Sequence, residues 1–219
     1  MKLRCERDTL VEALTTAGRA VSGRGGQLPV LSGLHLVLVG DQLVVTGSDL
    51  ELTIARTLEV KGETDGSAVV PSKLLIDVVR SLEPGAIELD LSELDLTIRG
   101  GRSEFSIRTI STDEFPQLVS AEGPAVTIEA GSFVAALRQV VPAASSDDSR
   151  PILTGVLLTP TEGGLRLVAT DSYRLAVSDI PGASVLQGDQ SVLVPSRALA
   201  EVRRVVGDAP ELTLRLGES

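Results

Sequence analysis

Residues 29–33 read Pro-Val-Leu-Ser-Gly, and residues 151–155 read Pro-Ile-Leu-Thr-Gly, 122 positions further along the chain. At the same offset the similarity continues to Asp49 and Asp171, and positions 29–49 share six identical residues with positions 151–171. Residues 70–72 match residues 194–196 at an offset of 124, and residues 11–14 match residues 134–137 at an offset of 123. Three blocks in the same order at nearly constant offset indicate a duplicated domain.

The length of 219 residues suits two domains of about 110 residues each, and we place them at 1–120 and 121–219. Each copy shows the pattern of a short strand, a helix, alternating strands and a second, amphipathic helix. A capping-box pattern at residues 9–12 places the first helix start at Asp8 or Thr9, and Ser132 marks the start in the second copy. The predicted helices are 8–20, 72–82, 131–141 and 196–206. The predicted strands include 2–6, 34–38, 43–55, 87–91, 94–99, 104–110 and 125–129. The expected fold class is therefore α+β, with two helices on an antiparallel sheet in each repeat.

The second repeat stops early. Residues 212–216 match residues 87–91, and nothing in the sequence corresponds to residues 92–116, which hold two predicted strands. A sheet that ended there would leave an unpaired apolar edge. We expect the second domain to be incomplete at its C-terminal strands.

Composition narrows the class of protein. No apolar run is long enough for a membrane span, the first residues do not resemble a signal peptide, and the single cysteine, Cys5, fits a reducing cytoplasm. The formal net charge of −10 argues against a general nucleic-acid binder. With His35 as the only histidine and no metal-ligand or phosphate-loop pattern, we expect no catalytic site, metal or cofactor. Asp49 and Asp171 occupy equivalent positions and are interpreted as turn residues.

Several stretches resemble the bacterial sliding clamp family, the β subunit of the replicative DNA polymerase III. They are residues 28–33, 47–51, 70–73, 101–105, 113–116, 150–153 and 169–175. The resemblance covers the whole chain and implies three such domains per subunit, two subunits closing into a ring around duplex DNA. By this resemblance the chain is domain one and most of domain two, with domain three absent. The family is not enzymatic, and a separate loader hydrolyses ATP.

The resemblance also implies that helices line the hole of the ring. The four predicted helices hold seven bases and four acids, a net charge of +3, so the rest of the chain carries −13. A weakly positive lining would hold the phosphate backbone without reading bases. Arg24 lies in a basic loop after the first helix, where the family has a DNA-contacting arginine. The expected DNA-facing residues are Arg24, Lys73, Arg80, Arg138, Arg197, Arg203 and Arg204.

Two protein interfaces follow from the same resemblance. Peptide motifs of the polymerase and of clamp-loader subunits are expected in an apolar cleft to which domain two contributes Leu153, Thr170, Ser172, Tyr173, Arg174 and Leu175. A simpler interpretation makes Leu153 and Leu175 core residues of adjacent strands. Phe105, on the last edge strand of domain one, is the candidate for the homodimer interface with the missing third domain.

Two other functions remain open at this point. The first is a shortened clamp relative that binds peptide motifs and does not encircle DNA. The second is an enzyme built on a duplicated α+β fold, which would depend on His35 or on the repeated aspartates.

Overall fold

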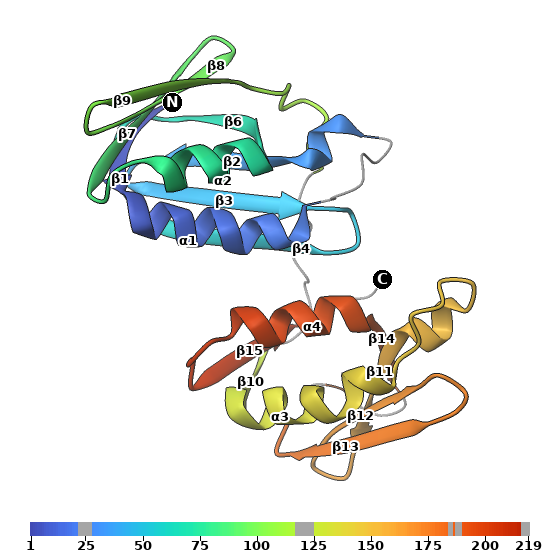
Figure 1. Ribbon diagram of the computed structural model, residues 1–219. Helices are drawn as coiled ribbons and strands as arrows, with labels where there is room; N and C mark the ends of the chain where they lie inside the picture. Colours follow the sequence, from blue (N-terminus) through green and yellow to red (C-terminus); the bar gives the residue numbers. More distant parts are fainter. Residues whose placement is uncertain (22–27, 117–124, 184–185, 187–189, 216–219) are drawn as a thin grey trace. The chain divides into compact units, whose positions relative to one another are not determined.

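The computed structural model describes residues 1–21, 28–116, 125–183, 186 and 190–215 (Figure 1). The chain divides into two compact units, Met1–Leu118 and Val119–Ser219, called unit 1 and unit 2 below. The predicted boundary between residues 120 and 121 falls outside the described residues, and it stays a prediction.

Unit 1 combines two antiparallel sheets with two helices. The first sheet has the strand order β5-β1-β7-β8-β9, and the second has the order β4-β3-β2-β6. The strands of the first sheet are β1 (Lys2–Glu6), β5 (Lys61–Thr64), β7 (Ala86–Ser92), β8 (Asp95–Gly100) and β9 (Ser103–Arg108). Those of the second are β2 (Gly33–Val39), β3 (Gln42–Ser48), β4 (Thr53–Glu59) and β6 (Gly66–Pro71). The helices are α1 (Arg7–Ala17) and α2 (Ser72–Ser81), with short 3-10 turns η1 (Gly18–Ala20) and η2 (Pro29–Ser32).

Unit 2 repeats this plan with fewer strands. A four-stranded sheet has the order β13-β12-β11-β14, and β10 pairs with β15. The strands are β10 (Ala125–Glu129), β11 (Gly155–Thr161), β12 (Gly164–Thr170), β13 (Leu175–Pro181), β14 (Val192–Pro195) and β15 (Glu211–Arg215). The helical segments are α3 (Ala130–Val140), η3 (Val141–Ala143), η4 (Pro151–Thr154) and α4 (Ser196–Val205). The predicted fold class, α+β with a second copy short of strands, is confirmed.

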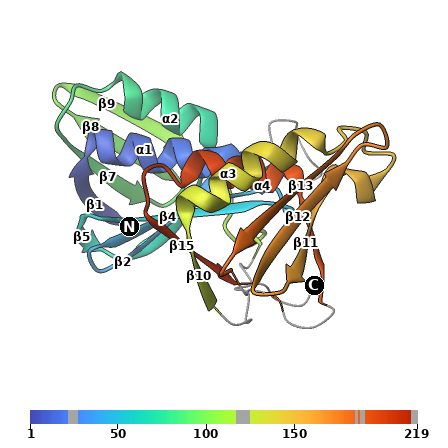
Figure 2. The same cartoon turned by 90° about the horizontal axis from the view of Figure 1, so that it is seen from below.

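Each unit has its own hydrophobic core under a pair of helices. Leu10 and Leu14 of α1 and Leu75 of α2 are fully buried in the core of unit 1. Phe133 of α3 and Leu199 of α4 are buried in unit 2. In both views the two helices of one unit lie side by side (Figure 2). Because burial of apolar side chains provides most of the folding free energy, these helical faces hold each unit together.

The predicted start of the first helix in each repeat is wrong by one to two residues, whereas the second helices begin at Ser72 and Ser196, as predicted. Helix α1 begins at Arg7, its N-cap is Glu6, and no side chain caps it, so the capping box at residues 9–12 does not form. Strand β1 runs directly into the helix, and the Arg7 N–H donates to the Gly85 carbonyl at 2.9 Å. One of the open N–H groups at the helix start is therefore satisfied by a tertiary contact and not by a side-chain cap.

The second copy makes the same contact. Helix α3 begins at Ala130 instead of Ser132, and the Ala130 N–H donates to the Pro210 carbonyl at 3.0 Å. Ser132 instead donates from its hydroxyl to the Glu129 carboxylate.

Two other predictions about strands differ from the structure. The predicted segment 43–55 is two strands, β3 and β4, separated by a turn at residues 49–52. The strands β5 and β6 were not predicted. Residues 68–70 of β6 are all buried, so this strand lacks the alternation that signals a half-buried strand.

Candidate functional site

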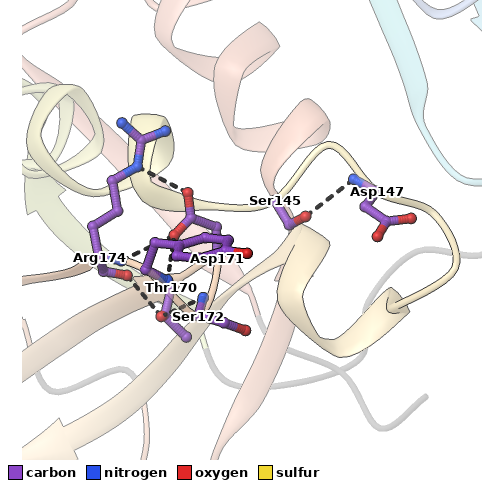
Figure 3. A network of polar contacts seen from close by, with 7 residues as sticks. Ser145, Asp147, Thr170, Asp171, Ser172 and Arg174 are labelled. Carbon is purple, nitrogen blue, oxygen red and sulfur yellow. Dashed lines mark hydrogen bonds and ion pairs between the residues drawn. The ribbon is translucent and has the colours of Figure 1, made fainter.

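The turn between β12 and β13 holds most of the predicted peptide pocket. The Asp171 carboxylate accepts hydrogen bonds from the backbone N–H groups of Tyr173 and Arg174, each at 3.0 Å, and from Arg174 Nε at 3.0 Å (Figure 3). These backbone donors, followed by the Arg174 charge, hold the pKa of Asp171 below its usual value. The turn is therefore fixed by a charged residue inside it, as expected for a turn aspartate.

Thr170 and Ser172 complete the turn. Thr170 Oγ1 donates to the Arg174 carbonyl at 2.7 Å and accepts from the Ser172 N–H at 3.2 Å. Ser172 has a φ of 79°, in the left-handed region that most residues avoid. The Thr170 hydroxyl thus bonds to the backbone of the turn at two points.

The apolar side chains of the turn point into solvent. Tyr173 is 94% exposed and Leu175 is 65% exposed. The interpretation of Leu175 as a core residue is therefore wrong. A turn that fixes its own backbone and presents an aromatic and an aliphatic side chain is suited to contact an apolar partner.

Leu153 lies in a neighbouring segment that is tied to this turn. Arg150, at the start of η4, donates from Nη1 to Ser172 Oγ at 3.4 Å and from Nε to Asp147 Oδ2 at 3.2 Å. The Leu153 carbonyl accepts from the Ser145 N–H at 2.8 Å, and its side chain is half-buried. The sequence interpretation did not include Arg150 in the site. The sequence signal that could have identified Arg150 is its position directly before the repeated Pro-Ile-Leu block.

The predicted DNA-facing bases lie on the helices in a repeated arrangement. Lys73 and Arg80 are seven residues apart on α2, and Arg197 and Arg204 hold the equivalent positions on α4. A separation of seven residues is about two helical turns, so each pair lies on one helical face. All four side chains are exposed.

The surroundings of these bases differ between the units. Arg80 donates from Nη2 to Thr15 Oγ1 at 2.9 Å, whereas Arg204 pairs with Glu201 of its own helix. The repeat counterpart of Thr15 is Arg138, which is exposed on α3. Arg203 is half-buried on α4, and Arg24 lies outside the described residues.

The remaining candidates are not gathered into a reactive site. Cys5 is buried, which raises the pKa of its thiol to about 12. His35 packs its ring 4.6 Å from the Phe115 ring, and burial lowers its pKa. Within the described ranges, no group of three or more potential metal-ligating side chains occurs. No described helix is long and apolar enough to cross a membrane.

Solved structures that match the whole chain include a DNA polymerase sliding clamp and a DNA polymerase III beta subunit. The sliding clamp of Bacillus subtilis superposes on the whole chain with a TM-score of 0.94 at 28% identity, and the chain covers 60% of that protein. The DNA polymerase III subunit beta of Pseudomonas aeruginosa does so with a TM-score of 0.92 at 29% identity, again with 60% of that protein covered. The duplicated α+β fold is therefore that of a clamp protein.

Sequence comparison identifies the family. Residues 1–119 match the family described as DNA polymerase III beta subunit, N-terminal domain, and residues 127–219 match its central domain. The beta sliding clamp of Micrococcus luteus is 35% identical across the whole chain, which spans 71% of that protein. That of Bacillus subtilis is 32% identical over 97% of the chain and 58% of that protein. The chain belongs to the beta sliding clamp family of DNA polymerase III, as the sequence motifs predicted.

Proposed function

We propose that this chain supplies the first two domains of a ring-forming clamp that encircles duplex DNA and tethers the replicative polymerase. Family membership supports the clamp role. The observation that carries the DNA-facing assignment is the recurrence of two exposed bases, seven residues apart, on the second helix of both units. In an acidic chain, bases at both of these positions in both units are not expected to occur by chance.

The helices would face the phosphate backbone. Lys73, Arg80, Arg138, Arg197, Arg203 and Arg204 lie on helices, and Arg24 is proposed for the same role by resemblance. Contacts from such side chains to phosphates position a protein on DNA without reading its sequence. Because a closed ring is retained by topology, weak contacts suffice, and strong ones would slow sliding.

The turn at residues 170–175 would receive partner peptides. Tyr173 and Leu175 are exposed apolar contacts, while Thr170, Ser172 and Arg174 hold the turn that presents them. Leu153 would contribute from η4. Short motifs of the polymerase and of clamp-loader subunits bind such surfaces through a few apolar anchors.

Ring closure would use the far edge of the first sheet. Phe105 lies on β9, the last strand of the five-stranded sheet in the described part of unit 1, and is 38% exposed. We propose this edge as the contact with the third domain of a second subunit, in a cytoplasmic, non-catalytic homodimer.

A retention assay tests the DNA-facing assignment. The native gene product would be loaded on nicked circular DNA, and the variant Arg197→Ala/Arg204→Ala compared with Arg4→Ala/Arg56→Ala, which removes two exposed bases from strands β1 and β4. We expect retention to fall, and its dependence on salt to become weaker, only for the helix variant. Equal retention of all three proteins would contradict the basic lining.

A peptide-binding module that does not encircle DNA is the second candidate, because the exposed turn of unit 2 needs no ring to present Tyr173. Native mass separates the two. A third repeat of similar length would give a subunit of roughly 38 kDa, native as a dimer. A stable monomer near the 22.9 kDa of this chain would favour the module.

A further inference from the structure

The loop that follows η3 closes around the carboxylate of Asp147. Asp147 Oδ1 accepts hydrogen bonds from the Ser149 N–H at 3.1 Å and from the Ser149 hydroxyl at 2.6 Å. Its other oxygen, Oδ2, accepts from Arg150 Nε at 3.2 Å, and the Asp147 N–H donates to Ser145 Oγ at 3.1 Å (Figure 3). These contacts, with that of the Ser149 hydroxyl first, hold the pKa of Asp147 below its usual value. The carboxylate is therefore charged at neutral pH and lies against the Arg150 guanidinium.

Arg150 connects this loop to both segments of the proposed peptide pocket. Its Nη1 donates to Ser172 Oγ at 3.4 Å, in the turn between β12 and β13. Its carbonyl accepts from the Leu153 N–H at 2.9 Å, within η4. The Leu153 carbonyl in turn accepts from the Ser145 N–H at 2.8 Å, so the loop also holds the far end of η4. Arg150 therefore lies between the segment that carries Leu153 and the turn that carries Ser172.

Unit 1 shows that the backbone of the turn does not depend on such a link. At the offset of 122, Leu28 holds the position of Arg150. Leu50 holds the position of Ser172, and a leucine side chain forms no hydrogen bond. Leu50 nevertheless has a φ of 77°, close to the 79° of Ser172. The link in unit 2 is thus not needed to form the turn, and what it adds is a fixed spacing between the turn and η4.

That spacing matters for a pocket built from two segments. Tyr173 and Leu175 are presented by the turn, and Leu153 is presented by η4. Any freedom of one segment relative to the other has to be removed when a peptide contacts both, which weakens binding. The Arg150 side chain is 47% exposed, and a long side chain at the surface keeps one conformation only when its guanidinium is held by partners. The charged partner that holds it is Asp147.

We propose that Asp147 is a positioning residue for the partner-peptide pocket, because it aligns the Arg150 guanidinium that fixes the spacing between η4 and the turn at residues 170–175. The proposal rests on the peptide pocket proposed above and adds a residue outside it. Asp147 acts through Arg150 without contacting the peptide. Because the turn forms without the link, loss of Asp147 lowers peptide affinity and leaves the stability of unit 2 nearly unchanged.

Peptide affinities of single and double variants test the proposal. The probe is a fluorescein-labelled peptide with the clamp-binding motif of the replicative polymerase, titrated with the native gene product and followed by fluorescence anisotropy. Asp147→Ala and Arg150→Ala should each weaken binding about fivefold. The double variant should bind no more weakly than Arg150→Ala, because both residues act through one contact. Asp148→Ala removes the same charge from the next exposed position and is the matched control, with unaltered affinity.

Asp147→Asn separates the alignment of Arg150 from closure of the loop. The amide oxygen still accepts from Ser149, but the amide nitrogen is a donor and does not accept from Arg150 Nε. We expect the same loss of affinity as in Asp147→Ala, with thermal unfolding unchanged. Unaltered affinity in Asp147→Asn, or a double variant in which the two single losses multiply, would overturn the proposal.

Tyr173→Ala, measured in parallel, distinguishes failure of this proposal from failure of the pocket assignment. Weaker binding in Tyr173→Ala together with unaltered binding in Asp147→Ala would refute the positioning role and leave the pocket in place. Unaltered binding in Tyr173→Ala would refute the pocket itself, and the positioning role with it.

Discussion

The turn at residues 48–53 and the turn at residues 170–175 have the same backbone and different surfaces. In each, an aspartate carboxylate accepts from the N–H groups two and three residues later, at 3.2 and 2.8 Å for Asp49 and at 3.0 Å for both in Asp171. In each, a hydroxyl one residue earlier accepts from the N–H of a residue with positive φ, 77° for Leu50 and 79° for Ser172.

The side chains that these two turns present are different. Glu51 and Thr53 of unit 1 correspond to Tyr173 and Leu175 of unit 2. Two positions that are polar in unit 1 hold an exposed aromatic and an exposed aliphatic residue in unit 2, while the aspartate that fixes the turn is the same. The two repeats therefore share the backbone of the turn and differ in the side chains that it presents.

The helix pairs differ in the same manner. Helices α1 and α2 hold three bases and three acids, whereas α3 and α4 hold four bases and one acid. The net positive charge predicted for the helices is thus concentrated in unit 2. If the helices contact DNA, unit 2 should contribute more to the electrostatic attraction.

The largest effect is expected at the turn of unit 2. Tyr173→Ala or Leu175→Ala should weaken binding of a polymerase-derived peptide by about 10- to 100-fold, or about 1–3 kcal/mol, because each removes an exposed apolar anchor. Calorimetric titration of the native gene product measures this. Glu51→Ala and Thr53→Ala, at the same positions of unit 1, are the matched controls. Unaltered affinity in a correctly folded Tyr173→Ala protein would refute the pocket assignment.

Removal of the Phe115 ring from unit 1 should have the next largest effect. Phe115→Ala should destabilise unit 1 by about 1–2 kcal/mol, because the ring is half-buried against Val30, Leu31 and Val69. Chemical denaturation measures this loss.

The same substitution should raise the pKa of His35. Burial lowers that pKa, so protonation opposes folding, and unit 1 should lose stability as the pH falls below the usual histidine value of 6.5. In Phe115→Ala the His35 pKa should return toward 6.5, and the acid-side loss should shrink. An unchanged His35 titration, followed by NMR, would show that the ring does not exclude water.

A smaller difference is expected between the helices. Replacing the four proposed DNA-facing bases of α3 and α4 (Arg138, Arg197, Arg203 and Arg204) by alanine should reduce the salt dependence of DNA retention more than replacing the two of α2 (Lys73 and Arg80), because more phosphate contacts are lost. Each lost phosphate contact lowers the slope of log affinity against log salt by about 0.9. Equal slopes for the two variants would remove the proposed asymmetry between the units.

The smallest effect concerns the aspartate of the unit 2 turn. Hydrogen bonds lower the pKa of Asp171, so its stabilising contribution is present above the usual value of 3.8 and is lost as the pH falls through the lower folded value. Asp171→Asn should therefore flatten the acid limb of thermal unfolding, measured from neutral pH downwards. Asp208→Asn removes the same charge from another exposed position and should leave that limb steeper than in Asp171→Asn.

The repeat predicted the fold because it reports on backbone geometry. Pro29 and Pro151 begin equivalent 3-10 turns, and Asp49 and Asp171 fix equivalent loops. The helix starts at Arg7 and Ala130 were missed because their N–H groups bond to distant residues, Gly85 and Pro210. Propensity alone favoured local caps at Thr9 and Ser132.

The candidate sites were less accessible to sequence reasoning. Exposure of Leu175 could not be predicted from the pattern alone, since an aliphatic residue at the start of a strand also fits a buried position, whereas its side chain is exposed. Arg150 was not recognised because its partner, Ser172, lies 22 residues away. In unit 1, Ile110 and Phe115 pack against a small buried cluster of residues that are distant in sequence, and no local pattern reveals such tertiary packing.

Topological retention on DNA tests the central claim most directly. The native gene product would be loaded on a nicked circular plasmid, isolated with it, and followed after one enzyme linearises the DNA. A ring whose helices face the duplex should stay on the circle and slide off the linear molecule at moderate salt. Protein that remains bound after linearisation, or that is never retained on the circle in the presence of its loader, would contradict the account.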